Sequence, residues 1–331
     1  MNFSSTSNFR AAFFVTLLLS MPAHGTDPIP LVEIQSEILP DGNIRDPAPT
    51  EDELKEFAAT IRKNMVFMKG GTFEMGDWGS EVNESGLPFD GNYDSKPLHK
   101  VTLSSFYIGK YPVTYAEFDI FTAARRLPRI NQSSFAKRYR KPDNPAGVTW
   151  QGAKDYCQWL AQLTGERFDL PTEAQWEYAA RSGGKRHLYP TDNGNVEEGR
   201  NLPSYEQEKA AGGLVSVSRF PPNQAGIHYM SAGVQEYTND WYDPQYYEKS
   251  PAINPPGPAM GTARVMRGFA GTYLSAMTFN RWPAKQTDRT GKWILYATSP
   301  EQKDREIPYT KYSGRADAAF RCVSNEERYP M

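Results

Sequence analysis

The sequence RFDLPTEAQWEYAAR at residues 167–181 decides the fold of this chain. It predicts a short strand that ends at Leu170, followed by a helix whose first free backbone amides are capped by the hydroxyl of Thr172. Glu173 falls in the first turn, where the positive end of the helix dipole favours a carboxylate. Glu177 and Arg181 lie four residues apart and can pair across one turn. The stretch therefore has a complete structural interpretation, and no reaction follows from it alone.

The amino-terminal residues have the pattern of a secretory signal peptide. Arg10 precedes an apolar run over residues 11–20, and residues 21–25 place small residues at the usual cleavage spacing, with cleavage expected after Gly25. The run is too short to span a bilayer, and no cysteine follows it that could accept a lipid. We expect a signal peptide over residues 1–25, no membrane span after its cleavage, and a soluble protein in a bacterial periplasm.

Residues 26–64 are expected to form a proline-dotted linker and a short amino-terminal helix. Thr50 and Glu53 match a capping box, and apolar residues recur at helical spacing between Leu54 and Ile61. This helix either packs on the main domain as a lid or binds a partner. The main domain is expected over residues 65–331.

The composition argues against a nucleic-acid-binding protein and against a helical bundle. The chain has 37 Lys plus Arg against 39 Asp plus Glu, so it has no strong field with which to attract nucleic acid. Its 26 glycines, 26 prolines and 13 % aromatic residues suit a loop-rich fold held together by aromatic packing better than a helical bundle.

Further blocks of sequence occur in a definite order around residues 167–181. They are FEMG at 73–76, a Val-Thr helix start at 113–114, FPPNQAGI at 220–227, RVMRG at 264–268 and AFRCV at 319–323. In this order the chain resembles the formylglycine-generating enzyme, or sulfatase-modifying factor, family from about residue 65 to residue 323. The resemblance implies a single α+β domain with the loop-rich fold of that family, distantly similar to a C-type lectin.

Cys157 and Cys322 are the only cysteines in the chain. In an oxidising compartment such a pair is most simply one disulfide. Both also fall where the resemblance places a structural bridge. On the chain-entropy model the bond would contribute roughly 2–5 kcal/mol to stability.

Enzymes of the family carry two cysteines shortly after the strand that corresponds to residues 264–268, where soft thiolates bind copper. Here the segment RGFAGTYLSAMTFNR at 267–281 contains none. Tyr273, Ser275 and Thr278 cannot substitute, because an unactivated hydroxyl is neither a soft ligand nor a ready thiolate. We therefore expect a pseudoenzyme that does not use copper.

One structural calcium ion is a further implication of the resemblance. The family holds it through backbone carbonyls, an Asn and a carboxylate, the hard oxygen ligands that calcium prefers. The corresponding positions here are Ser231, Gly233, Val234 and Glu236, with Gly233 in place of the Asn. The alternative is a plain turn without metal.

Two stretches are longer than in the family, namely residues 76–94 and 285–315. The second contains Trp293, Ile294 and Tyr296 among charged residues, a composition that fits a protein–protein hot spot. A buried strand at the same place is an equal alternative.

The functional hypothesis follows from the resemblance. Exported members that lack the cysteines resemble TagR-type periplasmic regulators of type VI secretion, which implies a non-catalytic protein acting on the periplasmic part of a membrane Ser/Thr kinase. One alternative is an enzyme with altered chemistry that uses Glu236, Tyr237 or Arg281 in the old substrate groove. Another is a calcium-dependent lectin-like module that binds glycans or peptides.

Overall fold

The computed structural model describes residues 36–40, 42–269, 272–285 and 312–326. In it, threonine side chains cap the first turns of the predicted helices. The hydroxyls of Thr50, Thr114 and Thr172 each accept a hydrogen bond from the backbone amide three residues on, and in each case that residue completes a capping box. Thr149 caps a fourth helix, which ends at Gly165 in the left-handed conformation. The predicted start points at residues 50, 114 and 172 are therefore confirmed.

The α-helices are α1 (Glu51–Lys63), α2 (Gly79–Val82), α3 (Tyr115–Ala124), α4 (Trp150–Thr164), α5 (Glu173–Ala180) and α6 (Tyr205–Ala211). Short 3-10 helices are η1 (Ala136–Tyr139), η2 (Tyr246–Glu248) and η3 (Tyr273–Ala276). The first strands are β1 (Glu37–Ile38), β2 (Ile44–Arg45), β3 (Met65–Met68), β4 (Gly71–Met75), β5 (His99–Leu103) and β6 (Phe106–Gly109). The later strands are β7 (Phe168–Asp169), β8 (Gln235–Trp241), β9 (Ala263–Gly268), β10 (Trp282–Lys285), β11 (Ala318–Ala319) and β12 (Val323–Ser324).

The strands form two four-stranded sheets and two hairpins. One sheet has the order β10-β9-β8-β11 and the other the order β3-β6-β12-β7, while β4 pairs with β5 and β1 with β2. In the second sheet Val323 lies opposite Ile108 on one side and Asp169 on the other. Strand β12 therefore joins two strands that are far apart in the sequence.

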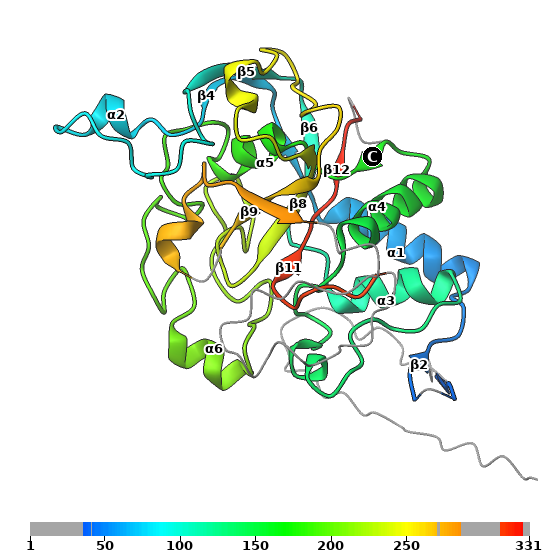
Figure 1. Ribbon diagram of the computed structural model, residues 1–331. Helices are drawn as coiled ribbons and strands as arrows, with labels where there is room; N and C mark the ends of the chain where they lie inside the picture. Colours follow the sequence, from blue (N-terminus) through cyan, green and yellow to red (C-terminus); the bar gives the residue numbers. More distant parts are fainter. Residues whose placement is uncertain (1–35, 41, 270–271, 286–311, 327–331) are drawn as a thin grey trace, which may run out of the picture.

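Helices α1, α3 and α4 gather on one side of the sheets, and α5 lies on the other side of β12 (Figure 1). Phe57 and Ile61 of α1 enter the same core as α4, so this helix packs on the domain as the first alternative predicted. The structure confirms a mixture of helices and sheets in one domain, whereas the likeness to a C-type lectin stays a prediction.

The expected linker is in part structured. Its described residues form the hairpin β1–β2, and Asp46 beyond it accepts two hydrogen bonds at 2.6 Å from Arg129. Sequence reasoning missed this hairpin because its strands are two residues long and their side chains are exposed or half-buried. None of the helices in the described residues is long and apolar enough to cross a membrane.

Candidate functional site

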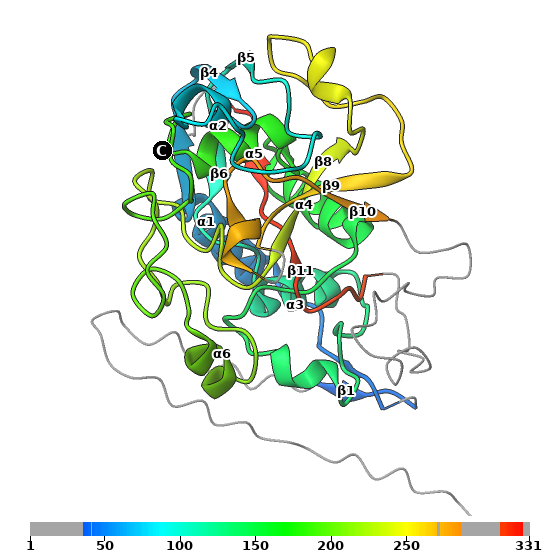
Figure 2. The same cartoon turned by 60° about the vertical axis from the view of Figure 1, so that its left-hand side comes forward.

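The candidate site is the segment 272–281 between β9 and β10 (Figure 2), where the sequence resemblance expects two cysteines. Thr278 is fully buried and donates its hydroxyl to the backbone carbonyl of His187 at 2.8 Å. The hydroxyl of Ser275 donates to the carbonyl of Thr272. These two hydroxyls are thus bound to backbone carbonyls, which do not activate an oxygen nucleophile as a neighbouring base would.

Beneath this segment two glutamates of α5 meet the arginine that follows this helix and two arginines from other parts of the chain. None of the five side chains is more than 3 % exposed. The members of this buried charge cluster are Glu173, Glu177, Arg181, Arg267 and Arg281.

Arg267 of β9 joins both glutamates. Its Nη1 donates to Glu173 Oε1 and its Nη2 to Glu177 Oε2, both at 2.7 Å. Nη2 also donates to the backbone carbonyl of Thr278 at 2.5 Å. One arginine thereby fixes α5, β9 and the candidate site relative to one another.

The other two arginines complete the cluster. Arg281 donates to both oxygens of Glu173, at 2.6 and 2.9 Å, and to the backbone carbonyl of Asp94 at 2.6 Å. Arg181 lies 2.8 Å from Glu177, as the spacing on the helix predicts, and its Nη1 donates to the carbonyl of Glu74 at 2.6 Å. Each carboxylate is therefore balanced by two guanidinium groups.

Beside the cluster, the carboxyl group of Asp240 has a pKa close to neutral pH. Burial would raise the pKa of Glu173, but the attraction of Arg281 and Arg267 outweighs it and holds that pKa below its ordinary value. Asp240 of β8 accepts a hydrogen bond from the backbone amide of Glu173 at 2.8 Å. Burial, together with repulsion from the Glu173 carboxylate, raises the pKa of Asp240 to about 8. At pH 7 Glu173 is therefore charged and most of Asp240 is protonated.

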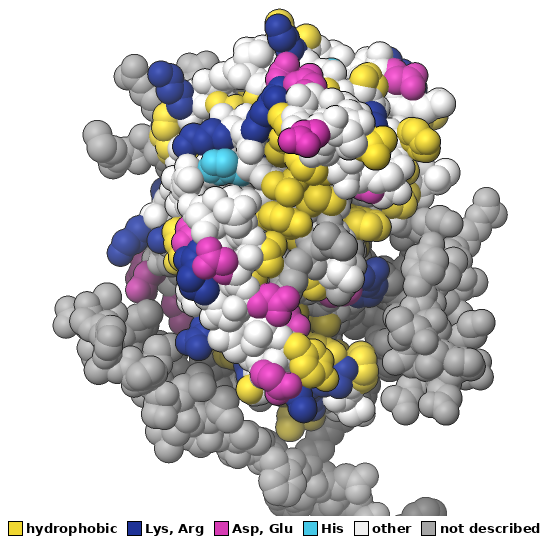
Figure 3. Space-filling view, turned by 90° about the vertical axis from the view of Figure 1, so that its left-hand side faces the viewer, with side chains coloured by type: hydrophobic (Ala, Val, Ile, Leu, Met, Phe, Trp, Pro, Cys, Tyr) yellow, Lys and Arg dark blue, Asp and Glu magenta, His cyan; other side chains and the backbone are white. Residues whose placement is uncertain are grey.

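The stretch 76–98, which contains the first predicted insertion, covers the outer side of the candidate site. Trp78 packs edge-on against Phe279 with ring centroids 5.4 Å apart, and Phe89 stacks on the same ring at 6.3 Å. Met277 joins this apolar cluster. Figure 3 faces the side from which α2 projects in Figure 1, and the hydrophobic side chains at its middle lie at the surface, outside this buried cluster. The side chains of Met277 and Phe279 in the candidate site are thus packed beneath this stretch.

The candidate calcium residues lie at the start of β8. Ser231, Gly233 and Val234 form the turn before the strand, and Glu236 lies within it. Both oxygens of Glu236 accept hydrogen bonds from Arg321, at 2.6 and 2.7 Å, and Oε2 accepts a further one from Trp176. A carboxylate engaged in this way fits a calcium ion poorly. In the described part of the chain no group of three acidic, His or Cys side chains is placed to hold a metal, and the calcium site stays a prediction.

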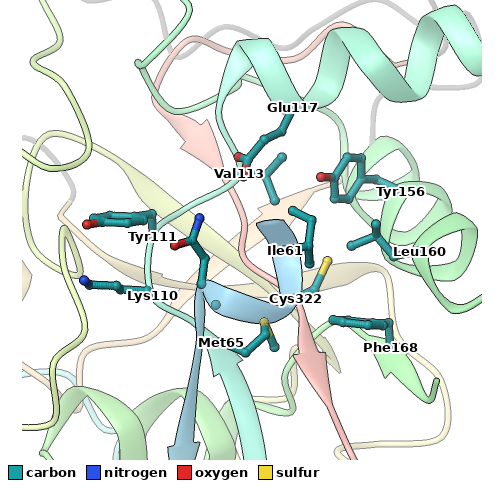
Figure 4. A pocket seen from close by; sticks show the side chains of 12 residues that line it. Ile61, Met65, Lys110, Tyr111, Val113, Glu117, Tyr156, Leu160, Phe168 and Cys322 are labelled. Carbon is teal, nitrogen blue, oxygen red and sulfur yellow. The ribbon is translucent and has the colours of Figure 1, made fainter. Parts of the chain in front are cut away.

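The predicted disulfide between Cys157 and Cys322 is confirmed. It joins α4 to the residue before β12 within the core that contains α1 and α3. A cavity of about 30 Å³ lies beside Cys322, and Figure 4 shows Glu117 and Tyr156 among the side chains that line it. This space suits water-sized molecules and leaves no room for a substrate.

The remaining predicted residues divide into two groups. Glu236, Tyr237 and Arg281, proposed for an altered enzyme, are at most 5 % exposed, so their polar groups lie inside the protein. The proposed partner patch of Trp293, Ile294 and Tyr296 falls outside the described residues.

Sequence reasoning did not find the buried charge cluster. Only the pair of Glu177 and Arg181 has a recognisable spacing, because both lie on one helix. Arg267 and Arg281 reach Glu173 across 94 and 108 residues, and no pattern within one sequence connects them. The other available signal was Arg267, a charged residue within the strand β9.

Comparison with known proteins places this site in context. The model of a family described as sulfatase-modifying factor enzyme 1-like domain matches residues 50–294. The formylglycine-generating enzyme of Streptomyces coelicolor is 30% identical over 263 residues, which are 64% of this chain and 79% of that enzyme. The inactive C-alpha-formylglycine-generating enzyme 2 of Mus musculus is 28% identical over 229 residues, covering 54% of this chain and 70% of that protein.

The serine/threonine-protein kinase pkn1 of Chlamydia pneumoniae is 32% identical over 229 residues, which are 63% of this chain and 33% of the kinase. The chain thus spans about a third of the kinase's length. Among solved structures, PvdO of Pseudomonas aeruginosa superposes with a TM-score of 0.58 at 22% identity, covering 78% of this chain and 93% of PvdO. That likeness concerns the fold alone.

Proposed function

This chain belongs to the sulfatase-modifying factor enzyme 1-like domain family, and we propose that it is a non-catalytic member that binds and regulates a protein of the cell envelope. One observation carries the proposal. The only two cysteines in the sequence, Cys157 and Cys322, are joined to each other in the core. Oxidation of a substrate thiol by the family's route needs reactive thiolates, and this chain has none to offer.

The geometry of the candidate site supports the same conclusion. Trp78 and Phe89 cover Phe279, and the hydroxyl of Thr278 is bound to a backbone carbonyl. A groove closed in this way also disfavours a lectin-like module that would bind its ligand at the same place. A relative is named as an inactive formylglycine-generating enzyme, which supports a non-catalytic role for this chain.

The proposed partner is the periplasmic part of a membrane Ser/Thr kinase that controls type VI secretion. Three Chlamydia proteins named as serine/threonine kinases contain a region similar to this chain, which supports a kinase-related context. The expected signal peptide and the disulfide support an oxidising, exported location.

Two measurements on residues 26–331, with the disulfide checked by intact mass, test the proposal. The first incubates the protein with copper and a cysteine-containing sulfatase peptide, with the Streptomyces enzyme as positive control. We expect no change in peptide mass, and copper-dependent conversion would contradict a non-catalytic role. The second is affinity capture from envelope membranes. We expect a membrane Ser/Thr kinase to be recovered specifically, whereas recovery of glycans alone would contradict the regulatory role.

A further inference from the structure

The stretch 76–98 has an outer surface in addition to the inner one that covers the candidate site. We propose that its tip, residues 80–88, is the docking surface for a protein partner whose own surface is apolar and bordered by lysine and arginine. The inference rests on the proposed function, because it names the surface through which that function would act. Figure 1 shows α2, which forms part of the tip, projecting from the body of the molecule.

The base of the tip is held closed by Asp77, which is 2 % exposed. Its Oδ1 accepts hydrogen bonds from the amides of Gly79, at 2.7 Å, and Phe89, at 3.2 Å, and its Oδ2 from the amide of Asp90 at 2.9 Å. A Cβ at Gly79 would lie 2.3 Å from the backbone nitrogen of Phe89. The two ends of the tip therefore meet without room for a side chain, as in a compact Ω-loop.

The tip also holds its own shape. The backbone amide of Asn83 donates to the carbonyl of Gly79 at 2.8 Å, and its side-chain amide donates to the carbonyl of Leu87 at 2.7 Å. Gly86 donates to the carbonyl of Asn83 at 2.8 Å. A loop ordered in this way before binding loses little conformational freedom when a partner docks.

The apolar side chains of the tip are left exposed by this arrangement. Val82 is 53 % and Leu87 63 % exposed, and Tyr93, on the same stretch, is 87 % exposed. They are three of the nine large hydrophobic side chains exposed among the described residues. The fold gains nothing from ordering apolar groups in water, whereas an interface does.

Charge determines the kind of partner. The tip contains Glu81 and Glu84 and no lysine or arginine, while Asp90, Asp94 and Lys96 follow it in the stretch 76–98. Asp94 is buried and Glu81 pairs with Arg186 of the body, while Glu84 is exposed at the tip. An acidic tip is attracted to a basic surface, and two copies of this chain would bring like charges together at this place.

Site-specific photo-crosslinking in the full chain tests the proposal. Benzoylphenylalanine replaces Leu87 or, as a matched control on α6, Tyr205, which is 71 % exposed. We expect a cross-link from position 87 alone, to a segment that mass spectrometry maps to apolar residues flanked by lysine or arginine. Equal cross-linking from position 205, a contact segment without basic residues, or no cross-link from position 87 would overturn it.

Binding of the cross-linked partner, once purified, gives the second readout. We expect the double variant Val82→Ser/Leu87→Ser to weaken binding by roughly tenfold or more, and the control Ile38→Ser, at an equally exposed site, to leave it within about twofold. Circular dichroism and the melting temperature check that both variants fold. If the double variant binds with unchanged affinity, the docking surface lies elsewhere while the proposed function stands. If the unmodified chain binds no envelope protein, both proposals fall.

Discussion

At the scale of one residue, Arg267 connects the elements that surround the candidate site. The side chain is fully buried and joins Glu173, Glu177 and the carbonyl of Thr278. Its position under the candidate site makes it a structural support for the segment in which the family's cysteines are expected. A buried arginine of this kind stabilises only as long as every partner is present.

Replacing Arg267 by Met should destabilise the protein by about 3–5 kcal/mol, because Glu173 and Glu177 each lose a buried counter-charge. Urea unfolding followed by tryptophan fluorescence measures the effect. Arg200→Met is the matched control, since Arg200 is paired with Asp192 and Glu197 at the surface, and it should change the unfolding midpoint little. Equal effects of the two variants would contradict the structural role of Arg267.

The stability of the chain should depend on Asp240 between pH 4 and pH 8. Burial and the Glu173 carboxylate raise the pKa of Asp240 from 3.8 to about 8, so in this range the folded protein holds a proton that the unfolded chain has released. The contribution of Asp240 to stability therefore falls as the pH rises and levels off above about pH 8.

The variant Asp240→Asn keeps an uncharged oxygen beside the amide of Glu173 and removes the titration. Urea unfolding of both proteins at several pH values should show the wild type losing stability relative to the variant from pH 6 to pH 8. All other titrating groups are common to the two proteins and cancel in the difference. A difference that does not change with pH would show that Asp240 does not hold this proton.

At the scale of elements, the sequence predicts what is local. The caps at Thr50, Thr114 and Thr172 were predictable because each bond joins residues three apart. The inward packing of the stretch 76–98 was not, since its Gly, Asn, Asp and Glu residues indicate only a polar loop. Trp78 and Phe89 show their role only when Phe279, about 190 residues later, is brought beneath them.

Gly79→Ala should open the base of the tip, because the added Cβ would meet the backbone at Phe89. We expect faster hydrogen exchange at the amides of Phe89 and Asp90, which donate to Asp77, and a stability loss of roughly 1–3 kcal/mol from the overlap. Gly91→Ala is the control, since its Cβ would meet no atom within 4 Å. Unchanged exchange in the Gly79 variant would mean that the base adjusts without opening.

The disulfide links helix α4 covalently to the residue before strand β12. Replacing both Cys157 and Cys322 by Ala should lower the free energy of unfolding by roughly 2–5 kcal/mol, since the bond closes a loop with a sequence separation of 165. Thermal unfolding of the variant and of the native protein, each under non-reducing conditions, measures this. A melting temperature that does not fall would contradict the expected contribution of the bond.

At the scale of the whole molecule, the family and the mixture of helices and sheets in one domain followed from the order of short blocks along the chain. For the candidate site, the sequence predicted the position in the chain but not the residues that surround it. The side chains that form the site come from α5, β9, the segment 272–281 and the stretch 76–98. Their contacts are set by three-dimensional packing and not by the spacing of residues along the sequence. The type VI secretion role and the calcium site stay predictions.

The position of β12 in the sheet also determines when the protein can complete its fold. Strand β12 fills the gap between β6 and β7, yet the ribosome makes it after both of them. Until it arrives, Glu236 lacks the counter-ion that Arg321 provides and Cys157 lacks its partner. The earlier parts of the chain therefore lack these contacts until the last strands have been made, and we expect both sheets to be completed only at the end of synthesis.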